Sequence, residues 1–481
     1  MYAVEVLDGR FCYIHKNRHV DRLSTLCAER AAMLLRLGSG TVTRGLHCLP
    51  APELQQLLDE LASRSPLRSL TWPDVAPLCQ LGRLRCLKLE RILVTHADLR
   101  AILAAMDPEI LTQLTVWKAS MLATIRCKCQ DLGPGPGWDE RVRGGCHEER
   151  QRDAVSLVEL VGRSRDLQRL QTDFELDVEC LATWGPYPCL RRLTLTRLAV
   201  SGMPRSVLTG RELQMLLLQM PALRELRCNV AHALAEVGVD AQFMLGRLEV
   251  LNVLLDQPAQ AAGISPVELL ARFCPNIREV TIRVSTERDL SPLRRLRHLE
   301  SLSLRFGGPG ARAFLNESFL EALGDAAHNL RHLELPVQAH LRSQALADGC
   351  PVLKSLVARC FFNRRRAGVE SPRRNSTMPL LEDLDVDTLV DASVLLPMCP
   401  QLTRLRLTLS QLTATDAREL ADLCLTHCPR LQQMTLQLLH AGCSHRAAVY
   451  LLQHLTRVPQ LRIFSSPSED MVNGDLPHWT A

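Results

Sequence analysis

The chain has 481 residues, more than a single hydrophobic core usually accommodates, so it must divide into domains or grow by repetition. Its apolar fraction is 46% but its aromatic fraction is only 4%, which favours a core of leucine-like side chains arranged in many small layers. The 57 basic and 52 acidic residues leave a formal charge of +5, so charge gives no support for nucleic-acid binding, and we expect no nucleic-acid partner.

The N-terminal segment, residues 1–41, contains VDRLSTLCAERAAMLLRL, whose apolar spacing predicts an amphipathic helix. We expect residues 1–41 to form a helical cap over the first of the repeats that follow. The opening MYAVEVLDGR lacks the order of a signal peptide, and no apolar run is long enough to span a membrane. We therefore expect a cytoplasmic or nuclear protein with no membrane contact, whose cysteines stay reduced.

An LxxLxL phrase then recurs about fifteen times over residues 42–464, and from Leu223 onward successive phrases begin 21 to 31 residues apart. In LTRLRLTL, the side chains of Leu402 and Leu405 would face a core while those of Arg404 and Arg406 would face solvent. The phrases begin at Leu67, Leu84, Leu111, Leu167, Leu190, Leu223, Leu248, Ile277, Leu299, Leu330, Leu353, Leu381, Leu402, Leu431 and Leu461.

Each phrase predicts a short strand followed by a loop and a returning helix, and stacked repeats bury one another's apolar faces. The predicted fold class is α/β: a leucine-rich-repeat solenoid shaped as a curved horseshoe. Its parallel strands would line the concave face, and its helices would cover the convex face.

Two stretches interrupt the repeats. Residues 127–152 are rich in glycine, proline and charge, which predicts a flexible loop. Residues 361–379 form a second predicted loop with two clusters of arginine, and Ser376 after RRN resembles a kinase site directed by basic residues. This second loop serves either localisation, contact with an acidic partner, or no role beyond solvation. Residues 465–481 are polar and predict a flexible tail.

Four cysteines share one position in the repeat. Cys274, Cys350, Cys399 and Cys428 each precede a proline and lie three residues before a ladder leucine or isoleucine. Proline ends the helix just before the next strand, and the cysteine is expected to be a small buried filler there.

The alternating repeat lengths, the Cys-Pro pairs and the phrase LTATDARELADLCLTHCPRLQQMTLQL resemble the cysteine-containing repeats of the F-box/leucine-rich-repeat family. The wider structural class of that family includes ribonuclease inhibitor. The resemblance covers roughly residues 42–464 and implies a protein-interaction scaffold that recognises substrates for a cullin-RING ubiquitin ligase of the F-box type. A ligase adaptor would then be a second partner, although no F-box is recognisable in residues 1–41. The likeness to ribonuclease inhibitor implies an alternative, an inhibitor or regulator that binds an enzyme directly.

No residue pattern typical of an enzyme is found, so we expect a non-catalytic protein without a cofactor. Cys127, Cys129, Cys146 and His147 suggest zinc, but their CxC and adjacent Cys-His spacings differ from the common structural zinc patterns. We expect no metal site.

The outward strand positions remain as the candidate site for a protein partner on the concave face. Trp117 would either anchor that partner or be covered by the 127–152 loop. Asp383 and Asp385, beside Arg404 and Arg406, would either bind a charged peptide or neutralise one another across adjacent strands, and the second interpretation is favoured. The candidate residues are Trp117, Arg169, Arg227, Arg283, Arg359, Asp383, Asp385, Arg404 and Arg406.

Overall fold

The computed structural model describes much of the repeat region and an N-terminal hairpin, in two compact units. Unit 1 comprises residues 1–19 and 253–481, and unit 2 comprises residues 20–252. The described residues are 2–7, 10–15, 54, 57, 69–70, 72–79, 84–90, 93–117, 120–121, 140–177, 185–200, 203–205, 208–237, 243–253, 265–284, 287–306, 318–335, 340–358, 361–362, 377–409, 411–438 and 445–465.

Unit 2 contains a ladder of parallel strands in which each strand pairs with the next. Its strands are β4 (Cys86–Glu90), β6 (Gln113–Trp117), β8 (Arg169–Asp177), β9 (Arg192–Val200), β11 (Glu225–Asn229) and β12 (Val250–Val253). A short strand, β10 (Met203–Arg205), pairs antiparallel with β9, and a separate parallel sheet is formed by β3 (Ser69–Leu70), β5 (Leu93–Val94) and β7 (Ser120–Met121). The helices are α4 (Trp72–Cys79), α5 (His96–Ala105), α7 (Glu140–Arg163), α9 (Gly210–Gln219) and α10 (Ala233–Glu236).

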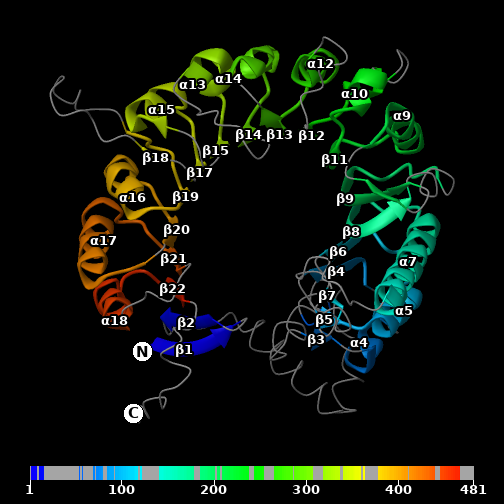
Figure 1. Ribbon diagram of the computed structural model, residues 1–481, viewed down its shortest axis with the longest axis horizontal. Coiled ribbons are helices and arrows are strands. Elements are labelled where there is room, and N and C mark those ends of the chain that lie inside the picture. The colour runs from blue at the N-terminus through cyan, green and yellow to red at the C-terminus, as the bar shows by residue number, and fades with distance from the viewer. Residues whose placement is uncertain are drawn as a thin grey trace. The chain divides into compact units, whose positions relative to one another are not determined.

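Unit 1 repeats the same arrangement with a second parallel ladder. Its strands are β13 (Glu279–Val284), β14 (Ser301–Phe306), β15 (His332–Leu335), β17 (Ser355–Ala358), β19 (Asp383–Val386), β20 (Arg404–Leu409), β21 (Gln433–Leu438) and β22 (Gln460–Ser465), with β16 (His340–Leu341) and β18 (Phe361–Phe362) forming a separate short pair. The helices are α12 (Pro266–Phe273), η3 (Glu287–Arg295), α13 (Ser318–Leu323), α14 (Asp325–His328), α15 (Ser343–Gly349), α16 (Leu389–Leu395), η4 (Leu396–Met398), α17 (Ala414–His427) and α18 (His445–His454). Within unit 1 the helices lie on one side of the ladder strands (Figure 1).

The ladder leucines form the core of each unit, so the α/β leucine-rich-repeat prediction is confirmed. Leu402, Leu407 and Leu436 have no exposed surface, and Leu405 is only 2% exposed. Burial alternates along the strands, as in the sequence RLRLTL of β20, because successive side chains of a strand point to opposite faces of the sheet. The apolar face therefore packs beneath the helices, and the other face carries the polar side chains.

One backbone contact recurs between successive repeats of each unit. The carbonyl oxygen of Thr403, just before β20, accepts hydrogen bonds from the amides of Gln432 and Gln433 at 2.8 and 3.0 Å. The carbonyl of Glu382 accepts two amides of the following repeat in the same way, both at 2.9 Å. The same double contact recurs at Arg85, Thr112, Gln168, Arg191 and Arg224 in unit 2, and at Arg278, Glu300, Arg331 and Lys354 in unit 1. It fixes the register between neighbouring strands.

The predicted repeat frame was wrong at both ends. Leu70 pairs with Val94 of the short sheet, so the phrase beginning at Leu67 does not start a ladder strand. Leu461 lies opposite Met434, which is the fourth residue of the phrase that begins at Leu431. The last phrase therefore begins three residues before Leu461, at Val458. A four-residue LxxL match allows both errors, because it does not show which of its two apolar residues comes first in the repeat.

The four cysteines before prolines share one backbone conformation. Each caps a helix with φ between −128° and −118° and ψ between 61° and 66°, and the residue three positions later donates its amide to the cysteine carbonyl. All are buried, from 0% to 3% exposed, as the sequence predicts. Burial raises the pKa of the Cys274, Cys350 and Cys428 thiols to about 12 and raises the pKa of Cys399 as well.

The N-terminal prediction differs from the structure. Residues 2–15 form strands β1 (Tyr2–Leu7) and β2 (Arg10–His15) rather than a helix, and β2 pairs antiparallel with β22, the last ladder strand of unit 1. Alternating apolar residues on either side of Asp8-Gly9 are a hairpin signal that the helical prediction overlooked. The hairpin covers the edge of β22, and the predicted helix within residues 16–41 lies outside the described residues.

The first predicted loop is in part a helix. Residues 140–152 belong to α7. This helix packs on α5 through Asp153, whose side chain is fully buried. The Asp153 carboxylate accepts a hydrogen bond from Arg100 at 3.1 Å and lies 2.5 Å from Nδ1 of His96. The loop prediction was therefore wrong for residues 140–152. It rested on glycine and charge within 127–152, whereas the helix is stabilised by the contacts of Asp153 with α5.

In the second predicted loop, residues 361–362 form β18 and residues 377–379 precede β19, while Ser376 lies outside the described residues. The tail prediction for 465–481 falls outside them as well, except for Ser465 at the end of β22. Among the helices described, none is both long and apolar enough to cross a membrane.

We predict that Leu405→Ala lowers the free energy of unfolding by about 2 to 5 kcal/mol, because it removes a buried side chain and leaves a cavity. Val357→Ala, at a half-buried outward position two strands away, is the control and should cost less. Chemical denaturation followed by circular dichroism measures both. Equal small losses would show that Leu405 does not face the core.

We also predict that Cys274, Cys350 and Cys428 resist iodoacetamide at pH 8 in the folded protein, while the half-exposed Cys86 and Cys189 react. Mass spectrometry of the alkylated peptides measures this. Because the folded state keeps a proton that the unfolded thiol releases above about pH 8.5, stability should also fall as pH rises from there toward 12. Rapid labelling of the three buried cysteines without unfolding would contradict their place in the core.

Candidate functional site

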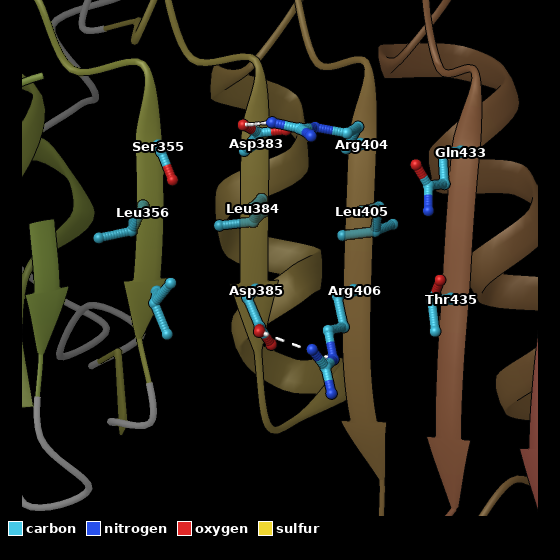
Figure 2. Close-up of a pocket in the computed structure, with 11 residues that line it drawn as sticks. Ser355, Leu356, Asp383, Leu384, Asp385, Arg404, Leu405, Arg406, Gln433 and Thr435 are labelled. Atoms are coloured by element: carbon cyan, nitrogen blue, oxygen red, sulfur yellow. Dashed lines mark hydrogen bonds and ion pairs between the residues drawn. The ribbon is translucent and has the colours of Figure 1, made fainter. Parts of the chain in front are cut away.

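The outward face of unit 1 carries a shallow hollow on strands β17, β19, β20 and β21 (Figure 2). Its volume is about 260 Å³. The strand register places Ser355, Asp383, Arg404 and Gln433 in one row across these strands. The row below it contains Val357, Asp385, Arg406 and Thr435. Both rows follow from the ladder, since one buried apolar side chain separates them on each strand, namely Leu356, Leu384, Leu405 or Met434.

Asp383 and Arg404 form a two-pronged ion pair in the first row. The guanidinium donates from Nε to Oδ1 and from Nη2 to Oδ2, a geometry in which the planar group matches the carboxylate. The hydrogen bond to Asp383 raises the pKa of Arg404 above its usual value, so the side chain stays charged. Arg404 nevertheless remains 63% exposed, whereas Asp383 is 24% exposed.

Asp385 and Arg406 form a looser pair in the second row. Nε of Arg406 lies 3.8 Å from Oδ2 of Asp385, and Nη2 donates to the side-chain oxygen of Gln437 at 3.1 Å. Arg406 is 55% exposed and Asp385 is 20% exposed. In both rows the carboxylate is the less exposed partner, and the guanidinium is the more exposed one.

The two interpretations of this cluster are therefore compatible. The opposite charges pair across adjacent strands, as the favoured interpretation predicts, while the arginines keep exposed surface that a partner can contact. Exposed ion pairs contribute little to the free energy of folding. The stability of the sheet therefore does not require these charges to be arranged in this way.

The other predicted site residues are spread over both units. Arg169 is exposed on β8 and donates to Gln171 at 3.4 Å, and Arg227 is half-buried on β11. Trp117 ends β6 and Arg283 lies in β13, but their side chains are outside what the structure describes, as is Arg359 altogether. Of the predicted residues whose side chains the structure describes, Asp383, Asp385, Arg404 and Arg406 lie together, while Arg169 and Arg227 lie on strands of unit 2.

Three polar residues near the hollow were missed. Gln433 and Thr435 follow from the phrase at Leu431 by the same alternation that identified the arginines. Arg462 on β22 lies opposite Thr435. It was not assigned to the outward face because the last phrase was placed three residues too late. The corrected frame gives all three.

The described residues contain no group of three or more His, Cys, Asp or Glu side chains placed to hold a metal ion. The zinc candidates Cys127 and Cys129 fall outside the described residues, and only the backbone of Cys146 and His147 is described, within α7.

Comparisons with known proteins identify no family for this chain. No family model matches the chain, and no curated protein matches it. Among solved structures, a chain of the crystal structure of the Rad7 and Elc1 complex in yeast matches with 15% sequence identity and a TM-score of 0.36. The match covers 68% of this chain and 96% of that chain. A likeness of this size gives no account of what the chain binds, so the function is inferred from the hollow itself.

We predict that Asp383→Ala and Arg404→Ala each change the free energy of unfolding by less than about 1 kcal/mol, because the pair is solvent-exposed on one side. A double-mutant cycle by chemical denaturation gives the coupling between the two side chains. A coupling of several kcal/mol would show instead that the pair holds the sheet together.

Proposed function

We propose that the chain is a non-catalytic scaffold that binds a protein partner on the outward strand face of unit 1. The observation that carries this proposal is the hollow, in which two rows of opposite charges meet and the arginines keep more than half of their surface exposed. Paired charges on a rigid sheet select partners by complementary charge while adding little to stability.

The rigidity of the site supports the same proposal. The side chains stand on strands whose register is fixed by backbone hydrogen bonds and whose other face is packed with buried leucine. A binding surface of this kind loses little conformational freedom when a partner docks, which favours association.

We further propose that the partner is a substrate recognised for a cullin-RING ubiquitin ligase of the F-box type. Support comes from the resemblance of the cysteine-containing repeats to that family, and the four cysteines occupy one shared helix-capping position in this chain. The ligase adaptor would then contact a part of the chain other than the hollow.

The test exchanges the charges of one pair. The double variant Asp383→Arg with Arg404→Asp keeps an ion pair between the same strands but inverts the surface that a partner meets. Its matched control inverts an exposed pair one helical turn apart on α17, Arg418→Asp with Asp422→Arg. Tagged full-length chains are purified from cells, and the captured proteins are quantified by mass spectrometry.

We expect the strand-face exchange to remove at least one protein that the wild type and the α17 control both retain, with no change in thermal unfolding. Retention of every captured protein by the strand-face variant would refute binding at the hollow. Capture of a cullin and its adaptor together with that protein supports the ligase role, whereas stoichiometric capture of an enzyme without them supports the direct inhibitor instead.

A further inference from the structure

The outward side chains of unit 1 change in charge from β19 to β22. β19 presents Asp383 and Asp385, and β20 presents Arg404 and Arg406. The outward positions of β21 and β22 are Gln433, Thr435, Gln437, Gln460, Arg462 and Phe464. Among strands β19 to β22, the outward carboxylates therefore lie on one side of the β20 arginines, and the outward positions of β21 and β22 hold no acidic residue.

Arg406 contacts both sides, because its guanidinium lies beside Asp385 (Figure 2) and also reaches Gln437 on β21. Within the described residues, Arg406 donates one hydrogen bond on the β21 side, to the amide oxygen of Gln437, and its Nε lies 3.8 Å from Asp385. A guanidinium has five N–H donors, so Arg406 keeps donors for a further acceptor. Arg404, in contrast, already gives two hydrogen bonds to Asp383.

Arg462 lies in the same row, two strands from Arg406. The register runs from Arg406 to Thr435 and from Thr435 to Arg462, which places the two arginine Cα atoms about 10 Å apart at the usual strand spacing. Arg462 is exposed, and within the described part of the chain its side chain has no ion pair or hydrogen bond. Two long basic side chains thus flank a threonine hydroxyl on a polar strand.

We propose that the partner segment bound by unit 1 is acidic, and that it places an Asp or Glu carboxylate over Thr435, between Arg406 and Arg462. This inference rests on the proposed function, since it names the chemistry of the segment that docks on the same face. A carboxylate there accepts from both guanidinium groups and from the hydroxyl of Thr435, and it relieves the repulsion between two like charges in one row.

The exposure of the charged groups favours an acidic segment over a basic one. The carboxylates of Asp383 and Asp385 are 24% and 20% exposed and already face arginines, whereas Arg404 and Arg406 are 63% and 55% exposed. An approaching chain therefore meets cations first. Over β20, β21 and β22 the outward positions hold three arginines, namely Arg404, Arg406 and Arg462, and no acidic side chain.

The experiment measures peptide binding to the full-length protein by fluorescence anisotropy at low salt. The probe is a labelled ten-residue peptide of alternating Glu and Ser, compared with matched peptides that carry Gln or Lys in place of Glu. The variants are Arg406→Gln and Arg462→Gln, and the control is Arg305→Gln, an exposed outward arginine on β14 of the same sheet. Thermal unfolding of each variant checks that the fold is retained.

We expect the Glu peptide to bind and the Gln and Lys peptides to bind more weakly by about tenfold or more, which is the size of one charge-assisted hydrogen bond. Arg406→Gln and Arg462→Gln should each weaken the Glu peptide by about tenfold, and Arg305→Gln should leave it within about twofold. Equal affinity for the three peptides, or equal losses in all three variants, would overturn the inference. Binding of a phosphoserine peptide without binding of the Glu peptide would overturn it too.

Failure here is distinct from failure of the proposed function. If Arg462→Gln keeps every protein that the exchanged Asp383 and Arg404 pair loses in cells, the hollow binds a partner but not through an acidic segment at Thr435. If the exchanged pair loses nothing, the strand face of unit 1 is not the docking surface at all.

Discussion

The structure depends on one hydrogen-bonding arrangement that recurs between successive repeats within each unit. A single carbonyl oxygen before a strand accepts two amides of the following repeat, as Thr403 does from Gln432 and Gln433. A slip of one residue would break both contacts and would turn buried leucine toward solvent and charged side chains into the core. Register, and with it the identity of the side chains that meet on the outward face, is thereby fixed from strand to strand.

The chemistry of the outward face follows from that register. Asp383 meets Arg404 and Asp385 meets Arg406 because each pair occupies the same row of adjacent strands, although the partners are 21 residues apart in the chain. The same rule aligns Arg406, Thr435 and Arg462. A repeat fold can therefore assemble a charged surface without any loop, and its side chains differ from one strand to the next while the backbone stays the same. Such a surface suits recognition of another protein.

The sequence predicts the parts of the molecule that repeat and fails where they stop repeating. Leucine spacing identifies the buried ladder, and two-residue alternation identifies Asp383, Asp385, Arg404 and Arg406 as outward. The errors arise where a short pattern has two solutions. The LxxL pattern fits two frames at Leu461, and the wrong frame left Arg462 out of the outward positions. Gly144-Gly145 among charged residues predicted a loop, whereas these residues lie within α7, which contacts α5. The ion-pair geometry, with arginines more exposed than carboxylates, needs the packed strands and could not be predicted from spacing.

The central claim is that a protein partner docks on the strand face of unit 1 and not on its helices. Arginine footprinting with phenylglyoxal, read by mass spectrometry on the chain alone and on the complex that it forms in cells, tests this claim most directly. The account predicts that the partner slows modification of Arg404, Arg406 and Arg462 and leaves Arg418 on α17 and Arg446 on α18 unchanged. Protection of Arg418 and Arg446, with the strand-face arginines modified as fast as in the free chain, would contradict it.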